Sequence, residues 1–295
     1  NINMHSIINS LDDISHKYET LFVDLWGCVH DGYSPFNEAV EALKKYRSKG
    51  LGSVVLLTNS PRPRESVEKQ LDKIGVPSDC WDTIATSGDS ARAAMFKGVV
   101  TEKIFHIGPK HDLSFFNNMN LVKEACLIER VPSETAEGIV CTGPFNDAND
   151  LPSDYTELFS SFIERKLKFL CANPDIVVDR GKTRVYCAGA LAKLYTEMGG
   201  RSLYFGKPHK PIYDLAYERL KEINLEVAKE KILCVGDGIL TDIKGAVNAN
   251  LDSLFITGGL AARETDTTIQ PNELNLKKFL QNQDYIPTHS IGHLR

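Results

Sequence analysis

Short apolar runs alternate with amphipathic segments along most of the chain, and this alternation predicts its secondary structure. In the first third, the runs at 21–23, 54–57 and 83–86 have the length and composition of buried strands. The segments 37–49 and 64–74 between them repeat apolar residues on one helical face, and a glycine follows each. Strands that alternate with helices predict a parallel sheet with right-handed crossovers.

The middle of the chain repeats this order and predicts a second α/β unit. Its expected strands lie at 103–108, 138–143 and 169–173, and its expected helices at 154–165 and 189–198. Because this block has enough apolar strands for a core of its own, we interpret residues 88–200 as an inserted domain.

After the insert, the chain returns to the first unit. Apolar runs at 202–205, 231–235 and 252–256 predict strands, separated by helical segments at 211–223 and 239–248. The predicted fold is a Rossmann-like α/β core with a parallel sheet, residues 1–87 and 201–295, plus an inserted α/β cap domain, residues 88–200. The ends are less patterned, and we expect a short leading helix at 6–17 and, beyond Thr265, only one helix, near 276–280.

The composition is typical of a globular protein, with 42% hydrophobic and 25% charged residues. No apolar run approaches membrane-spanning length, so we expect no membrane partner. The net charge is −5 and no Lys/Arg run occurs, which argues against a nucleic-acid partner. Seven cysteines lie singly without a CxxC spacing, and the first residues lack the features of a secretory signal. We therefore expect free thiols in a cytoplasmic protein.

Asp24 directly follows the first apolar strand, and it is the first candidate for chemistry. Gly27 and the Asp31-Gly32 pair after it predict tight turns. In open α/β sheets, active sites collect beyond the carboxyl ends of strands. A carboxylate in that place is a candidate nucleophile or metal ligand, but the same pattern is also typical of a plain turn cap.

Three later strand edges carry further candidates. Thr58 and Asn59 end the second strand, Lys207 lies in a turn before a helical segment, and Asp237 ends a later strand, with Asp242 five residues on. Each also has an ordinary structural interpretation. Thr58 would form an ST-turn, Lys207 would be a solvated lysine and Asp242 would be a helix N-cap.

The order Asp, Thr, Lys and a pair of Asp, each at a strand edge, resembles the haloacid dehalogenase superfamily of phosphohydrolases. The long insert between the Thr and Lys motifs contains Asn173-Pro174-Asp175, and in this it is similar to class IIA of that superfamily. Class IIA comprises phosphatases of the p-nitrophenyl phosphatase and nucleotide or sugar phosphatase type with a C2 cap. The resemblance covers roughly residues 18–260. It implies Mg²⁺-dependent hydrolysis of a small phosphorylated metabolite, a phosphomonoester, through an aspartyl-phosphate.

The resemblance also implies roles for the residues at the strand edges. Asp24 would be the nucleophile, acting with Thr58 and Lys207. The Thr58 hydroxyl, the Asn59 backbone N–H and Lys207 would bind the phosphate. In this interpretation Lys207 also neutralises the charge that the carboxylates share.

The expected Mg²⁺ ligands, again by resemblance, are Asp24, the backbone carbonyl of Trp26 and Asp237. Asp242 would belong to the same metal site, where it would orient a metal-bound water. A backbone ligand needs no particular side chain, so a tryptophan at position 26 does not by itself abolish the site.

In the insert, Asn173 and Asp175 would form a loop that selects the substrate, although a proline turn with an Asx hydrogen bond explains them equally well. Arg180 would meet an anionic substrate. His30 and Asp31 are either residues at the mouth of the pocket or turn formers. The family also uses such caps as dimerisation surfaces, so the resemblance suggests a homodimer formed through the cap.

Trp26 departs from the family pattern. In the family's phosphatases, the residue two positions after the nucleophile is a second Asp, which serves as general acid and base. The departure leaves two rival interpretations open. One is a metal-free dehalogenase-type hydrolase, which has no need for Asp237 and Asp242. The other is a catalytically weakened homologue that binds phosphate without turnover.

Overall fold

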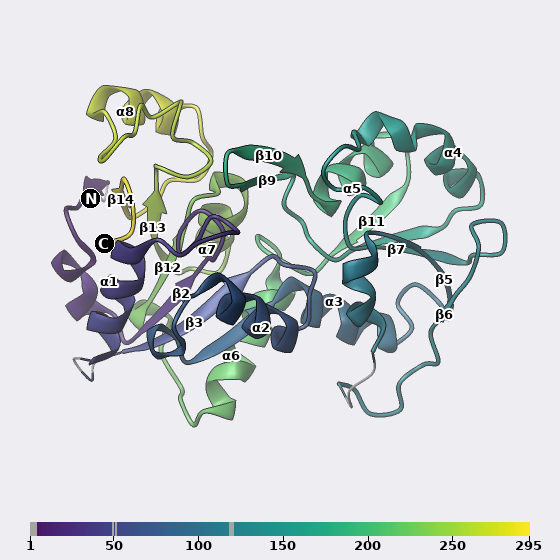
Figure 1. The fold of residues 1–295 in the computed structure, drawn as a ribbon, viewed down its shortest axis with the longest axis horizontal. Coiled ribbons are helices and arrows are strands. Elements are labelled where there is room, and N and C mark those ends of the chain that lie inside the picture. The colour runs from purple at the N-terminus through teal and green to yellow at the C-terminus, as the bar shows by residue number, and fades with distance from the viewer. Residues whose placement is uncertain (1–4, 49, 51, 118–120) are drawn as a thin grey trace.

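The computed structural model describes residues 5–48, 50, 52–117 and 121–295. Two lobes lie side by side, and the chain leaves the first lobe, builds the second and returns (Figure 1). Each lobe has a parallel sheet with helices packed against it. The predicted fold class, an α/β core with a parallel sheet and an inserted α/β cap, is therefore confirmed.

The core sheet joins seven parallel strands among the described residues, in the order β1-β14-β13-β12-β2-β3-β4. Their bounds are β1 (Ser6–Ile7), β2 (Thr20–Val23), β3 (Ser53–Thr58), β4 (Thr83–Thr86), β12 (Ile232–Gly236), β13 (Asp252–Ile256) and β14 (His289–Ile291). The strands that follow β2 in sequence, β3 and β4, extend the sheet on one side of β2. The strands that follow β12, β13 and β14, extend it in the opposite direction. The boundary between β2 and β12 is thus the switch point where ligands bind in such sheets.

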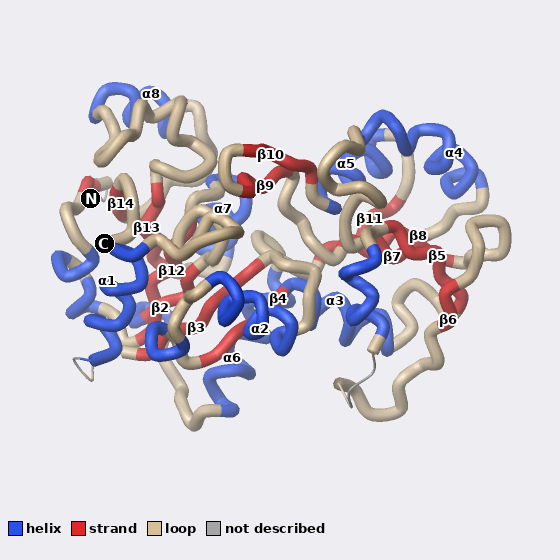
Figure 2. Tube along the Cα trace, viewed as in Figure 1, coloured by secondary structure: helices blue, strands red, loops and turns tan. Residues whose placement is uncertain are grey.

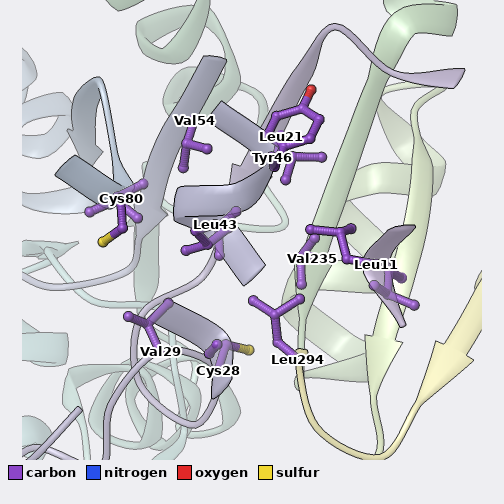
Figure 3. Close-up of a cluster of buried hydrophobic side chains, with 14 of the residues drawn as sticks. Leu11, Leu21, Cys28, Val29, Leu43, Tyr46, Val54, Cys80, Val235 and Leu294 are labelled. Atoms are coloured by element: carbon purple, nitrogen blue, oxygen red, sulfur yellow. The ribbon is translucent and has the colours of Figure 1, made fainter. Parts of the chain in front are cut away.

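Helices cover both faces of the core sheet. Leu21 and Val23 of β2 pack against α1 (Asn37–Ser48) and α2 (Arg64–Ile74), and Figure 3 shows Leu21 with Leu43, Val54 and Val235 in this cluster. Phe22 points to the opposite face, towards α6 (Lys210–Glu222) and α7 (Lys244–Asn248). This burial on both faces explains why the strands are continuously apolar rather than alternating.

The cap sheet joins five strands of the described chain, in the order β11-β8-β7-β5-β6. Their bounds are β5 (Lys103–Ile107), β6 (Glu129–Arg130), β7 (Gly138–Cys141), β8 (Lys168–Cys171) and β11 (Arg201–Tyr204). The helices α4 (Thr156–Glu164) and α5 (Ala188–Glu197) cover one face, where Phe159 and Tyr195 are fully buried. The helix α3 (Ser87–Phe96) covers the other face. The cap therefore has hydrophobic clusters of its own.

The prediction that residues 202–205 form a strand of the core is wrong. These residues belong to β11, which pairs with β8 of the cap sheet in the register Ser202↔Phe169. The helix α5 joins β8 to β11, so the pair is an ordinary parallel crossover that the cap completes before the chain returns. An apolar run at a domain boundary does not indicate which sheet will take it. With this correction, the division into core and cap domains stays a prediction.

The two ends of the chain also differ from expectation. The predicted leading helix at 6–17 is β1 followed by single 3₁₀ turns at Leu11–Asp13 and Ser15–Lys17. The tail forms the helix α8 (Glu273–Gln281) and the strand β14, which pairs with β1. Strands of two or three residues leave no readable periodicity. The helix predicted at 37–49 is present to Ser48, and Lys49 lies outside the described residues.

A two-stranded hairpin, which the sequence did not predict, projects from the cap. Its strands are β9 (Val177–Arg180) and β10 (Thr183–Tyr186), and it lies between the lobes (Figures 1 and 2). The hairpin touches the core, because the Gly181 N–H donates to the Asp31 carbonyl at 2.8 Å. In the described part of the chain, no helix has the length and apolar character needed to span a membrane.

Candidate active site

A cleft between the lobes holds the residues that the sequence singled out. Asp24 and Thr58 line it from the core, and Asn173 and Asp175 line it from the cap. The cleft contains about 720 Å³ of space, part of it open to solvent. At its base, Asp24, Trp26, Asp175 and Asp237 surround a smaller cavity. The structure thus brings the candidates from both lobes to one place.

Lys207 is the centre of the polar contacts at this base. Its Nζ donates to Asp24 Oδ1 at 3.1 Å, to Asp242 Oδ1 at 2.7 Å and to the Leu57 carbonyl at 2.6 Å. Only 3% of the Lys207 side chain is exposed. The lysine is therefore not the solvated surface residue of the alternative interpretation. We call Asp24, Asp237, Asp242 and Lys207 the nucleophile cluster.

Asp237 and Asp242 are held by the backbone around them. Asp237 Oδ2 accepts from the Leu260 N–H at 3.1 Å, and Asp242 Oδ2 accepts from the Gly238 N–H at 3.0 Å. Gly27 has a φ of +79° and lies so near Asp237 that a Cβ there would be 2.4 Å from Oδ2. Only glycine allows this close approach. With one oxygen on Lys207 and the other on Gly238, Asp242 orients the lysine and also closes the turn after β12.

Burial governs the protonation of the cluster. Burial raises the pKa of Asp237 to about 7, and the Asp242 carboxylate adds to the rise. Burial and Asp242 also raise the pKa of Asp24, while Lys207 opposes them. For Lys207, burial lowers the pKa, but the carboxylates of Asp24 and Asp242 outweigh it and hold the pKa above its ordinary value. The site therefore has more negative charge than one ammonium balances.

Asn59 joins three of the predicted motifs through its side chain. Its Oδ1 accepts from the Lys207 N–H at 2.7 Å, and its Nδ2 donates to the Lys207 carbonyl at 3.0 Å and to Asp175 Oδ1 at 2.8 Å. The expected phosphate contact was the Asn59 backbone N–H, and no sequence feature indicated this side-chain bridge. Asp175 is thereby tied to the core, and burial raises its pKa to about 6.

Thr58 and Asn173 also show the local turns that were their alternative interpretations. The Thr58 hydroxyl accepts from the Ser60 N–H at 3.1 Å, which is an ST-turn. Asn173 Oδ1 accepts from the Asp175 N–H at 3.0 Å, which is an Asx turn. Both residues nevertheless line the cleft, so the turn and a binding role coexist in the geometry.

Trp26 lines the cleft beside Asp24 and is held there by packing. Its ring meets the His30 ring edge-on at 5.1 Å, and a Cβ on Gly32 would lie 2.4 Å from its Cζ3 atom. His30 is buried, its Nδ1 accepts from the Gly32 N–H, and burial lowers its pKa to about 4. Asp31 closes the turn by accepting from the backbone of Tyr33 and Ser34. These contacts support the turn-forming interpretation of His30 and Asp31.

The donor set at the base fits a hard divalent cation. The ligand atoms of Asp24, Cys28 and Asp237 lie within 4.8 Å of one another. Carboxylate oxygens are preferred Mg²⁺ ligands, whereas burial raises the pKa of the Cys28 thiol and leaves it a poor ligand. Among the described residues, no hydrogen bond ends on the Trp26 carbonyl. The excess of carboxylates over the Lys207 ammonium also favours a cation.

A second group of charged side chains lies in the same cleft, away from the nucleophile cluster. Arg62 Nε is 3.8 Å from Asp112 Oδ1, and His111 Nε2 is 3.7 Å from Asp112 Oδ1 and 3.9 Å from Asp147 Oδ2. Arg180 Nη2 donates to Asp147 Oδ2 at 3.1 Å. We call these five residues the cleft rim. Of the five, the sequence pointed only to Arg180. Arg62 and Asp147 lie in loops without a motif, and His111 and Asp112 lie in the 3₁₀ helix Lys110–Phe116, which has none either.

The chain belongs to the haloacid dehalogenase-like hydrolase family. The family description of haloacid dehalogenase-like hydrolases matches residues 21–122, and that of HAD-hydrolase-like proteins matches residues 204–278. A solved hydrolase of this family from Brucella suis 1330 is 38% identical, with a TM-score of 0.85 over 98% of this chain and 100% of that one. The predicted family is therefore confirmed, and the protein is a hydrolase.

More distant relatives are named phosphatases. The 5'-nucleotidase YutF of Bacillus subtilis is 23% identical over 264 residues, covering 86% of this chain and 93% of the relative. The p-nitrophenyl phosphatase from Archaeoglobus fulgidus is 20% identical, with a TM-score of 0.64 over 94% of this chain and 97% of that one. The second comparison shows that the two chains share a fold over nearly their whole length.

Proposed function

We propose that this hydrolase is a Mg²⁺-dependent phosphatase that hydrolyses a small phosphomonoester through an aspartyl-phosphate on Asp24. The observation that carries the proposal is the three-way contact of Lys207 with Asp24, Asp242 and the Leu57 carbonyl at the switch point of the sheet. A buried ammonium in that position holds the nucleophile and offers positive charge to an incoming phosphate. The phosphatase names of the relatives support the same reaction class.

In the proposed first step, a carboxylate oxygen of Asp24 attacks phosphorus and the bond from phosphorus to the substrate oxygen breaks. The leaving oxygen takes a proton from solvent, because the Trp26 side chain has no proton to transfer at neutral pH. In the second step, water attacks phosphorus, the bond to Asp24 breaks, and inorganic phosphate leaves. Thr58, the Asn59 N–H and Lys207 would hold the phosphate oxygens through both steps.

Asp24, Asp237 and the Trp26 carbonyl would hold Mg²⁺, with Asp242 beside them. The bound ion would neutralise phosphate charge and align the phosphoryl group with Asp24. The chain's own residues prepare this site, since Gly27 and Leu260 fix Asp237 and Lys207 fixes Asp24. Asn173 and Asp175 would close over the substrate from the cap.

The test is hydrolysis of p-nitrophenyl phosphate with Mg²⁺ and with excess chelator, by the wild type and by Asp24→Asn. We expect turnover only in the wild type with Mg²⁺, and a loss of roughly four orders of magnitude or more in the variant. Asp214→Asn is the matched control, because Asp214 is an exposed partner of Lys210 on α6. Full activity in chelator would support the dehalogenase-type alternative. Phosphate binding without turnover would support the non-catalytic one.

A further inference from the structure

We propose that the substrate carries a carboxylate in addition to its phosphate, and that Arg180 is the residue that selects for it. The inference rests on the proposed phosphatase function and specifies its substrate class. The cleft rim lines the same cleft as Asp24 but takes no part in the nucleophile cluster, so its charged side chains are free to contact the rest of the substrate.

The arginines of the rim have donors to spare. Arg62 makes no side-chain hydrogen bond among the described residues, and its nearest carboxylate, Asp112, is 3.8 Å away. Within the part of the chain that the structure describes, the Arg180 side chain makes a single hydrogen bond, to Asp147. A guanidinium has five N–H donors in a planar fork that matches a carboxylate. Both side chains are about one-third exposed, so a ligand in the cleft can reach these donors.

The backbone places Arg180 at a suitable distance from the reacting phosphate. Val178 lines both the cleft and the small cavity around Asp24, and Arg180 lies two residues further along β9. Side chains two apart on a strand point to the same face and lie about 7 Å apart along it. A substrate with its phosphate at Asp24 would thus present its far end, a few atoms away, to Arg180.

The surroundings favour an anion over a neutral group at that end. Asp147 holds Arg180 through one guanidinium nitrogen, and no other described residue pairs with the rest of the fork. Arg62 adds a second cation from the core side of the cleft, on the loop after β3. Asp112, the other acid of the rim, is 5% exposed and has Arg62 and His111 beside it, so it presents little free charge to the cleft.

The experiment compares two substrates that differ in one group. 3-Phosphoglycerate and glycerol 3-phosphate share a three-carbon chain and differ by a carboxylate in place of a hydroxymethyl group. We expect kcat/KM of the wild type to favour 3-phosphoglycerate by tenfold or more. In Arg180→Gln this preference should fall by roughly ten- to hundredfold, the range for a lost charged hydrogen bond. Arg62→Gln should lower it by a smaller factor.

Lys182→Gln is the matched control, since Lys182 is an exposed cation in the same hairpin outside the cleft. It should leave the preference unchanged. A wild type that hydrolyses both substrates equally, or prefers glycerol 3-phosphate, would overturn the proposal. An equal loss on both substrates in Arg180→Gln would also overturn it, because that result indicates a structural role.

Calorimetric binding of the same two compounds, to the wild type and to Arg180→Gln, separates this inference from the proposed function. If p-nitrophenyl phosphate is not hydrolysed, the phosphatase proposal fails, but tighter binding of 3-phosphoglycerate that depends on Arg180 would still support the carboxylate site. Equal affinity for both compounds would refute it, whatever the activity. Thermal melts of each variant confirm that it is folded.

Discussion

The nucleophile cluster and the cleft rim lie in one cleft but are built in different ways. Every member of the cluster lies at or near the end of a core strand or in a turn beside it, is at most 14% exposed, and is held by hydrogen bonds of 2.6–3.1 Å. The rim combines a core loop, a 3₁₀ helix and a loop of the cap, and a hairpin strand, and most of its contacts lie between 3.7 and 3.9 Å. The cluster is fixed by its surroundings, and the rim retains unpaired donors.

This difference indicates a division of labour. A fully paired, buried site is preorganised for one kind of chemistry, because its charges need no rearrangement during the reaction. A loosely paired site on loops is suited to contacts that vary with the substrate. We therefore expect changes in the cluster to affect all substrates equally, and changes in the rim to affect particular substrates.

After Asp24→Asn, the largest expected effect is that of Lys207→Met. The variant leaves Asp24 and Asp242 buried without their cation, so activity should fall roughly 10²- to 10³-fold on every phosphomonoester tested. Unfolding in urea with chelator at pH 7 should show a loss of about 3–5 kcal/mol in the free energy of unfolding.

Lys210→Met is the control for Lys207→Met. Lys210 lies three residues on, is 83% exposed and forms a surface pair with Asp214. It should change the free energy of unfolding by less than about 1 kcal/mol. Substrate-dependent losses in Lys207→Met would break the comparison, because they would place Lys207 among the residues that select substrates.

Trp26→Asp should have the next largest effect, and in the opposite direction. A carboxylate two positions after the nucleophile would supply the acid and base that the cluster lacks, so kcat/KM for alkyl phosphates should rise roughly ten- to hundredfold. p-Nitrophenyl phosphate should gain less, because its leaving group departs as a stable anion. The smaller side chain loses the contacts with His30 and Gly32, so thermal melts must show that the variant is folded.

Trp26→Phe is the control for the loss of the indole, because it keeps an apolar ring and adds no carboxylate. It should leave the ratio of alkyl to aryl activity unchanged. If the wild type already hydrolyses alkyl phosphates at ordinary enzymatic rates and Trp26→Asp slows it, then another residue is the acid, and our account of the tryptophan is wrong.

The same contrast explains how much the sequence could predict. Asp24, Thr58 and Asp237 each follow an apolar run, so the parallel sheet predicted from that pattern already placed them at one edge. The bridge made by Asn59 was not predictable, because it depends on how Lys207 and Asp175, far along the chain, fold back onto it. The pattern of apolar runs also could not predict that β11 joins the cap sheet, since such a run fits either sheet.

The rim could not be predicted for a related reason. Arg62, Asp112 and Asp147 are widely separated in sequence. They lie in loops or in the short 3₁₀ helix Lys110–Phe116, where no periodicity fixes the direction of a side chain. The hairpin that carries Arg180 has apolar residues only at its outer ends, Val177-Val178 and Val185-Tyr186, and these are too short to predict strands. Chemistry at strand ends is thus readable from sequence, and selection by loops is not.

The pH dependence of the free energy of unfolding tests whether Asp175 behaves like the buried nucleophile cluster or like the cleft rim. Burial raises its pKa to about 6, above its value in the unfolded chain. The native state therefore binds a proton that the unfolded state releases, and the wild type loses stability as pH rises from about 4 through 6. In chelator, Asp175→Asn should remove this loss and be more stable than the wild type at pH 7 by about 1–2 kcal/mol.

At pH 4 the two proteins should differ little, because the wild-type carboxyl is then protonated. Denaturant titrations at pH 4, 5, 6 and 7 measure the trend. Asp179→Asn, in the same cap segment but exposed and paired with Arg184, is the control and should show no such trend. If the free energies of unfolding of the wild type and Asp175→Asn differ by the same amount at every pH, then Asp175 titrates like an exposed acid and belongs with the rim.

The smallest expected effect concerns the contact that closes the cap hairpin on the core. Gly181 has a φ of +60° and donates its N–H to the Asp31 carbonyl, and a Cβ on it would lie 2.9 Å from Tyr33 Cε2. Gly181→Ala should push the hairpin from the core and raise KM a few-fold, with kcat nearly unchanged, because the nucleophile cluster is not involved. Gly199→Ala is the matched control, since Gly199 also has a positive φ but nothing within 4 Å of its added Cβ. Both variants should lose about 1 kcal/mol of stability from the backbone, and only Gly181→Ala should change KM.

A double variant tests whether the contact with Tyr33 causes this change. Adding Tyr33→Ala to Gly181→Ala removes the clash and should lower KM part of the way back to the wild-type value. If KM stays high in the double variant, the backbone strain or the lost hydrogen bond, rather than the Tyr33 contact, controls how the cap meets the core.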